Sequence, residues 1–221
     1  MSYRIVTMVL LVGVTFALLV LCFGAGGVHL PANQQDYEPV QPIAFSHRLH
    51  AGELNMACLY CHGAAEESRH AGIPAGSTCM NCHRLVTAPV VSVQAEDKLA
   101  QEEKRQPQRI VSPELQKLYD DLGLTLNQKQ ELVPASEKRS RPVPWIKVYH
   151  LPDFVYFDHR AHVSVGVTCQ KCHGPVETME RVRQVGDLSM GWCVNCHRTA
   201  NQEGINGTRV YASTDCVICH H

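Results

Sequence analysis

The hydrophobic pattern divides the chain into one long apolar run and a remainder without any sustained apolar period. The run covers residues 5–23, which are nineteen consecutive residues without a charged side chain. A helix of this length spans the hydrocarbon core of a bilayer. Arg4 precedes it, which predicts that the N-terminus lies inside and the remainder outside. A cleaved signal peptide is the competing interpretation, but its apolar run is usually shorter. We therefore predict an uncleaved single-pass anchor over residues 1–30, with Cys22 as an ordinary residue within it.

Beyond the anchor, residues 24–42 are rich in Gly, Pro and Gln and predict an irregular tether. The remainder is poor in aromatic residues, which make up 6% of the chain. Lys plus Arg number 20 and Asp plus Glu number 21, so no basic excess indicates a nucleic-acid partner. A conventional apolar core is therefore not expected here, and another group must supply apolar volume.

The cysteine pattern indicates what that group is. Ten of the eleven cysteines fall in five Cys-x-x-Cys-His motifs, the pattern of c-type haem attachment, in which two thiols bind the vinyl groups and the histidine binds the iron. Zinc knuckles or disulfides are the competing interpretation. Neither requires a histidine after the second cysteine in every motif. We therefore predict five covalently bound haem c groups, held outside the cytoplasm, and a mostly α and irregular, haem-packed fold.

The predicted attachment residues and proximal iron ligands follow from the motifs. The attachment cysteines are Cys58, Cys61, Cys79, Cys82, Cys169, Cys172, Cys193, Cys196, Cys216 and Cys219. The proximal ligands are His62, His83, His173, His197 and His220.

The motifs belong to an internal repeat. Phe45-Ser-His-Arg-Leu-His50 matches Phe157-Asp-His-Arg-Ala-His162 position by position, and two motifs follow each copy. A two-haem unit thus occurs at residues 43–84 and again at 155–198. We predict a first haem module at 31–91 with two haems, an insertion at 92–145, and a second module at 146–221 with three haems.

Each iron needs a second axial ligand if it is to act as a six-coordinate electron carrier. The candidates are His47, His50, His159, His162, His150, His70, Met190 and Met179. On one helical turn, His159 and His162 would share a face and could serve two different irons.

We predict that the first histidine of each repeat closes the haem of the motif that follows it. The second histidine would then serve the second haem of its module. The fifth distal ligand stays open between Met190, which we favour, and His150. Core packing is the competing interpretation for Met190, and His70 and His221 are expected to contact solvent or propionate.

The insertion carries its own helix signals. Residues 96–106 are charged and predict a solvated helix. Ser112 is a good N-cap, with Pro113 at the first helical position, and Gly123 ends the apolar spacing. A second short helix is expected over Leu126–Val133, followed by a linker at 134–144. An insertion of this length is either an interaction element or a solvated segment without a partner.

Two resemblances extend this interpretation. The Phe-x-His-x-x-His segment ahead of Cys-x-x-Cys-His resembles the c3/c7 class of small multihaem cytochromes, in which the first histidine serves its own haem and the second serves another. The anchor, the two-then-three arrangement of motifs, and the segments 145–159 and 188–193 look like the pentahaem cytochrome c subunit of bacterial alternative complex III. This second resemblance covers nearly the whole chain and is loose in the insertion.

The second resemblance implies an electron-transfer subunit of a membrane complex that oxidises quinol. The implied partners are an iron–sulfur subunit, multi-span quinol-binding subunits and a monohaem cytochrome c subunit. A soluble cytochrome, a copper protein or an oxidase would be the acceptor. The haem domain would lie on the periplasmic side of the inner membrane.

Two other functions compete with this one. A membrane-anchored multihaem quinol dehydrogenase that feeds a periplasmic reductase shares the anchor. A multihaem reductase enzyme would need an open axial position on one iron, and no motif departs from the pattern. We expect no catalytic residue.

Overall fold

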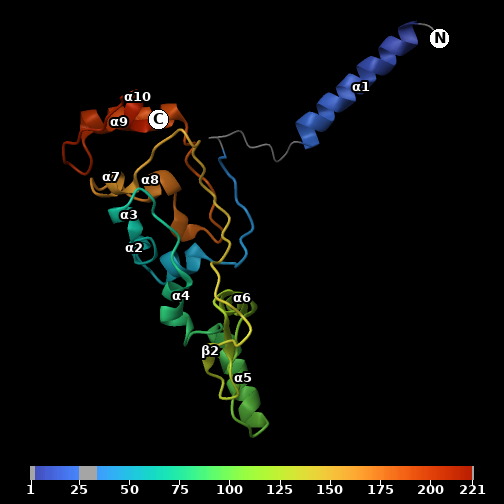
Figure 1. Ribbon diagram of the computed structural model, residues 1–221, viewed down its shortest axis with the longest axis vertical. Helices are drawn as coiled ribbons and strands as arrows, with labels where there is room; N and C mark the ends of the chain where they lie inside the picture. The colour runs from blue at the N-terminus through green and yellow to red at the C-terminus, as the bar shows by residue number, and fades with distance from the viewer. Residues whose placement is uncertain (1–2, 25–33, 221) are drawn as a thin grey trace.

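The computed structural model describes residues 3–24 and 34–220. The body is elongated: α5 and β2 lie at one end, α9 and α10 at the other, and α4, α2, α3, α7 and α8 between them (Figure 1). The elements in chain order are α1 (Tyr3–Gly24), η1 (Arg48–Glu53), α2 (Cys58–Cys61), α3 (Ala64–Glu67), α4 (Gly76–His83), α5 (Val90–Glu102), α6 (Pro113–Asp121), β1 (Leu124–Leu126), β2 (Leu132–Pro134), α7 (His159–Val163), α8 (Gln170–His173), η2 (Val176–Thr178), α9 (Met190–Glu203) and α10 (Cys216–Cys219).

The apolar run forms one helix, α1. Its stretch Tyr3–Leu21 has a mean hydropathy of 2.5, so by length and composition it could cross a membrane. A signal sequence near an N-terminus meets the same criterion. The Cys22 side chain and about half of the predicted tether, residues 25–33, lie outside the described residues.

Very few side chains of the motif-bearing segments are buried. Outside the insertion, the buried apolar residues among those described are Ile43, Ala65, Met179 and Ala200. Most motif helices are a single turn, and irregular segments connect them. The apolar area that these segments bury against each other is too small to stabilise the fold. This is expected if a bound group fills the interior.

The insertion, in contrast, has a small protein core. Ala100 of α5 and Leu118 and Tyr119 of α6 are buried. The predicted start of α6 is confirmed, because the Ser112 hydroxyl accepts a hydrogen bond from the Leu115 amide and Pro113 begins the helix. The helix predicted over residues 96–106 is observed as α5, which begins six residues earlier and ends four residues earlier. It begins directly after Pro89.

The helix predicted over Leu126–Val133 is wrong. This segment is an antiparallel hairpin of β1 and β2, with Thr125 opposite Val133. The Asn127 side-chain oxygen accepts hydrogen bonds from the amides of Lys129 and Glu131, and Gln130 has a φ of 61°. This side-chain-to-backbone turn competes with the helix and reverses the chain.

The insertion is fastened to the motif-bearing body at α4. The Tyr119 hydroxyl donates a hydrogen bond to the His83 carbonyl oxygen, at 2.5 Å. A Cβ added at Gly76 of α4 would lie 2.6 Å from a methyl carbon of Leu122, so the two segments are in close contact. Glu114 of α6 accepts a hydrogen bond from the Ala44 amide, at 2.7 Å. The insertion therefore covers the end of the body that carries the Cys79 motif.

Candidate functional site

One cavity connects all five motifs. It has a volume of about 3530 Å³, and at least one cysteine and the histidine of every motif line it. A site for one small ligand typically occupies about 300–1,000 Å³. Shared among five motifs, the cavity gives about 700 Å³ to each. Its size therefore fits several bound groups and not a single substrate.

The motif thiols are available for bonding to a prosthetic group. All ten are free, and within residues 3–24 and 34–220 no three His, Cys, Asp or Glu side chains are grouped to hold a metal ion. Burial raises the pKa of the Cys172 thiol to about 11, with a further contribution from the neighbouring Cys196. The described thiols thus form neither disulfides nor a zinc-type cluster.

Three motif histidines face a second histidine at a distance that fits one metal between them. The ring centroids are 6.4 Å apart for His159 and His173, and 6.1 Å apart for His50 and His83. The rings of His162 and His197 are 6.0 Å apart. A metal-bound imidazole nitrogen lies about 2 Å from the metal, so two imidazoles on opposite sides have centroids about 6 Å apart.

In six histidines the Nδ1 atom of the ring is hydrogen-bonded to a backbone carbonyl oxygen. The Nδ1 atoms of these rings lie 2.5–2.8 Å from a carbonyl oxygen, and because a carbonyl only accepts, each Nδ1 carries the proton. Nε2 is then left with its lone pair, which is the arrangement that metal-bound histidines show. The donor–acceptor pairs are His50–Ser46, His62–Gly72, His83–Val86, His159–Arg69, His162–Asp158 and His197–Ser213.

The two copies of the Phe-x-His-x-x-His repeat have the same local geometry. Phe45 meets His47 edge-on at 4.9 Å and stacks on His50 at 4.4 Å. Phe157 meets His159 edge-on at 4.8 Å and stacks on His162 at 4.5 Å. Each phenylalanine thus orients both histidines of its repeat, a role that the sequence comparison had not assigned to it.

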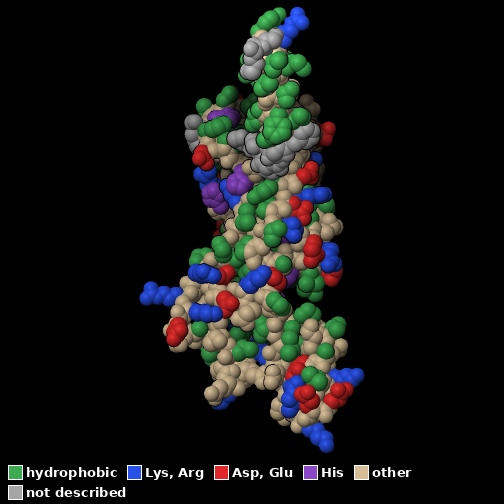
Figure 2. Space-filling view, turned by 90° about the vertical axis from the view of Figure 1, so that its right-hand side faces the viewer, with side chains coloured by type: hydrophobic (Ala, Val, Ile, Leu, Met, Phe, Trp, Pro, Cys, Tyr) green, Lys and Arg blue, Asp and Glu red, His purple; other side chains and the backbone are tan. Residues whose placement is uncertain are grey.

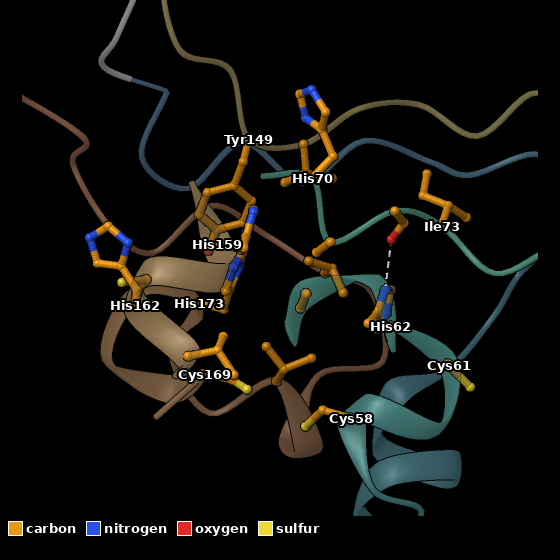
Figure 3. A pocket seen from close by; sticks show the side chains of 18 of the residues that line it. Cys58, Cys61, His62, His70, Ile73, Tyr149, His159, His162, Cys169 and His173 are labelled. Atoms are coloured by element: carbon orange, nitrogen blue, oxygen red, sulfur yellow. Dashed lines mark hydrogen bonds between the residues drawn. The ribbon is translucent and has the colours of Figure 1, made fainter. Parts of the chain in front are cut away.

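His159 and His173 lie side by side near Cys169, and His62 lies across from them near Cys58 (Figure 3). Burial lowers the pKa of His173 to about 4, with a smaller contribution from His159. Burial also lowers the pKa of His47 to about 4, followed by the effect of His62. The Nδ1 atom of His47 is buried and has no hydrogen-bond partner. At neutral pH these imidazoles are therefore uncharged, which is the form that binds a metal.

The fifth motif has a different environment. The ring of Phe154 stacks on His220 at 5.8 Å. Met190, at the start of α9, lines the cavity. The Nε2 atom of His150 donates a hydrogen bond to the Lys147 carbonyl, at 2.9 Å, so this nitrogen is engaged elsewhere. Met190 is 70% exposed, and its role as the distal ligand stays a prediction.

The remaining sequence candidates lie apart from these pairs. His70 lines the cavity, but its ring points away from His62 and His173 (Figure 3). Met179 is buried in the protein, and its carbonyl accepts a hydrogen bond from the Arg48 amide. His221 is outside the described residues. In the view of Figure 2, the lowest part of the surface, which the insertion forms, shows charged side chains but no histidine.

Tyr149 and two backbone carbonyls were not found from the sequence. The Tyr149 ring lies 4.5 Å from that of His173, and its hydroxyl accepts a hydrogen bond from the Val185 amide at 3.0 Å. The carbonyls of Arg69 and Ser213 orient His159 and His197. No residue type marks a carbonyl acceptor, so only the structure could show these contacts.

Comparisons with known proteins find similarity to multihaem cytochromes. Residues 155–221 match the profile of the family described as cytochrome c7 and related cytochrome c. The C-terminal segment is thus similar to c7-type multihaem cytochromes. This match implies covalently bound c-type haem in that domain. A relative from Nitratidesulfovibrio vulgaris, named menaquinone reductase, multiheme cytochrome c subunit, is 24% identical over 200 residues, which are 81% of this chain and 76% of that protein.

Proposed function

We propose that this chain is a pentahaem c-type cytochrome that relays electrons within a membrane quinone oxidoreductase complex. The single cavity lined by all five motifs supports this function most directly, because it places every candidate attachment site in one connected space. The chain is a carrier, and the quinone chemistry belongs to another subunit.

The proposed iron ligands follow from the paired rings. His159 with His173, His50 with His83, and His162 with His197 would hold three irons, because their rings face each other at 6.0–6.4 Å. By the equivalence of the two repeats, His47 and His62 hold a fourth. Met190 and His220 would hold the fifth, and a thioether ligand would give that iron a higher potential than the bis-imidazole sites.

Bound haem c supplies one-electron redox chemistry. Oxidation of one quinol to quinone releases two electrons and two protons, so this chain would accept the electrons one at a time and the protons would leave elsewhere. The paired side chains would hold each haem iron, and the Nδ1 hydrogen bonds orient six of the imidazoles for this role. Such a site exchanges electrons without binding a substrate.

The finer assignment is to a complex similar to alternative complex III. The partners would be an iron–sulfur subunit, multi-span quinol-binding subunits and a monohaem cytochrome, with a soluble acceptor. We propose that α1 anchors the chain in the inner membrane and that the modules at 31–91 and 146–221 lie on the periplasmic side. The resemblance of the sequence over the anchor and the motifs supports this assignment.

A second candidate has the electrons flowing towards quinone. The name of the Nitratidesulfovibrio vulgaris relative describes a reductase of menaquinone. In that case the chain would collect electrons from a periplasmic donor and deliver them to the membrane subunits. The same ligand set serves both directions, and the relative potentials of donor and quinone decide between them.

Purification of the complex from membranes tests these proposals. We expect five covalent haems per chain, together with co-purifying quinone-binding and iron–sulfur subunits. Replacing Cys216 and Cys219 by serine should remove about one fifth of the haem absorbance per chain, whereas Cys22→Ser, outside every motif, should remove none. Recovery of the chain alone, or with fewer than five haems, would contradict the proposal. Reduction by added quinol, or oxidation of reduced protein by added quinone, distinguishes the two directions.

A further inference from the structure

The two repeat copies contact each other reciprocally. Helix η1, which follows His47, packs against η2 of the second module. Helix α7, which carries His159, packs against α3 of the first module. Both η2 and α3 come just after the first motif of their module. Each histidine-bearing helix thus contacts the segment behind the other module's first motif.

Equivalent hydrogen bonds join the modules on both sides. The Arg48 amide donates to the carbonyl of Met179, at 2.9 Å, and the Arg160 amide donates to the carbonyl of Ser68, at 3.2 Å. Arg48 and Arg160 occupy the same position of the repeat. Ser68 and Met179 are each the tenth residue after the first cysteine of their modules. An exchange of equivalent contacts in both directions is the mark of a two-fold interface, formed here within one chain.

This interface places the first motifs of both modules at its centre. The sulfur atoms of Cys58 and Cys169 lie near each other there (Figure 3), and the two thiols interact. The second motifs lie outward, because His50 faces His83 of α4 and His162 faces His197 of α9. Helices α4 and α9 lie on opposite sides of this centre (Figure 1).

The fifth motif extends the row beyond the fourth. The Ser213 carbonyl, three residues before Cys216, accepts the Nδ1 hydrogen bond of His197 at 2.5 Å. Burial raises the pKa of the Cys193 thiol, and the next contribution comes from Cys219. Burial likewise raises the pKa of Cys79, followed by Cys61. The thiols in each of these pairs are close enough for their charges to interact, and each pair belongs to motifs that are neighbours in this row.

We propose that electrons pass through the five sites in the spatial order of the Cys79, Cys58, Cys169, Cys193 and Cys216 motifs. The first two sites are thus used in the reverse of their order along the chain. Each step moves one electron, so that one site is oxidised as its neighbour is reduced, and no atom or proton is transferred. Every electron that passes between the modules crosses the junction of the Cys58 and Cys169 sites. This inference rests on the proposed function and adds the route to it.

A double-mutant cycle of midpoint potentials tests the route. His47→Met, His50→Met and His159→Met each replace a proposed imidazole ligand by a thioether, which raises the potential of one haem and so labels it. The charge on one iron affects a near neighbour more than a distant one. We expect the shifts to be non-additive in the His47→Met/His159→Met double variant and additive in the His50→Met/His159→Met double variant.

A wrong electron route and a wrong function would give different results in this experiment. Greater non-additivity in the His50→Met/His159→Met variant, or additivity in both, would overturn the proposed order. Single variants that shift no haem potential would contradict the ligand set instead, and the proposed function would fail first if the purified chain carried no covalent haem.

A change at the junction provides a second test without altering any ligand. A Cβ at Gly52 of η1 would clash with the Glu177 carbonyl oxygen of η2, so Gly52→Ala must separate these segments. We expect the non-additivity between the labelled Cys58 and Cys169 sites to fall in this variant, with all five haems retained. Gly191→Ala is the matched control, because its nearest atom is 4.0 Å away. Unchanged interaction in Gly52→Ala would contradict a junction at this place.

Discussion

The Nδ1 atom of His159 lies 2.8 Å from the carbonyl oxygen of Arg69, a residue 90 positions earlier in the chain. The first module thus fixes the tautomer and the direction of a histidine that belongs to the second. Because metal-binding imidazoles depend on such partners, the second module cannot complete its first site alone. The two copies form one functional unit despite the insertion between them.

Carbon monoxide binding to the reduced protein tests whether every iron has two protein ligands. We expect no CO-reactive haem in the native chain. His162→Ala should create one, because it removes the imidazole that faces His197 at 6.0 Å. His150→Ala is the control and should create none, since the His150 Nε2 already donates to Lys147. A CO-reactive haem in the native chain would favour the enzyme interpretation.

Met190→His tests the fifth ligand. If the Met190 thioether binds the iron of the Cys216 motif, an imidazole in its place should lower the potential of one haem and leave the other four unchanged. A spectroelectrochemical titration measures this. Met179→Leu is the control, because Met179 packs within the protein. Five unchanged potentials in Met190→His would remove Met190 from the ligand set.

Tyr119 connects the insertion to α4. Its hydroxyl donates a hydrogen bond to the His83 carbonyl oxygen, and the residue is 1% exposed. Tyr119→Phe should lower the free energy of unfolding by about 1 kcal/mol, and Tyr119→Ala by about 3–5 kcal/mol. Denaturant unfolding of the haem-loaded protein measures both. Tyr211→Phe, at a residue that is 86% exposed, should have little effect, and equal losses at the two positions would contradict the contact.

The insertion should lose stability in acid through Glu96. Its carboxylate accepts hydrogen bonds from Arg105 and from the Gln108 amide, which lower its pKa from 4.5 to about 2. A carboxyl whose pKa is lower in the folded state stabilises the fold at pH values above its pKa in the unfolded state. This contribution is lost as the pH falls from about 4.5 towards 2. Glu96→Gln should weaken this part of the acid dependence of unfolding. An identical acid profile in the variant would contradict the contribution.

The motifs, the Phe and His repeat and the start of α6 were readable from the sequence, because each depends on local residue types. The hairpin at Leu124–Pro134 was not, because its apolar residues also fit a helix and the Asn127 turn decides the outcome. The contacts of Arg69 and Ser213 were hidden for a different reason: they use backbone oxygen atoms, which every residue possesses. Likewise, the repeat showed that two modules exist, but only the contacts of η1 and α7 showed how the modules are joined.

The insertion and the Cys216 motif follow equivalent points of the two copies. One copy continues into folded protein that covers α4, and the other continues into an additional redox site. In a symmetrical pair of modules, the two ends of the row of redox sites would be the same. Here the two ends differ, because one is covered by the insertion and the other carries an additional site. The row of sites therefore has a direction that the duplicated centre alone would not have.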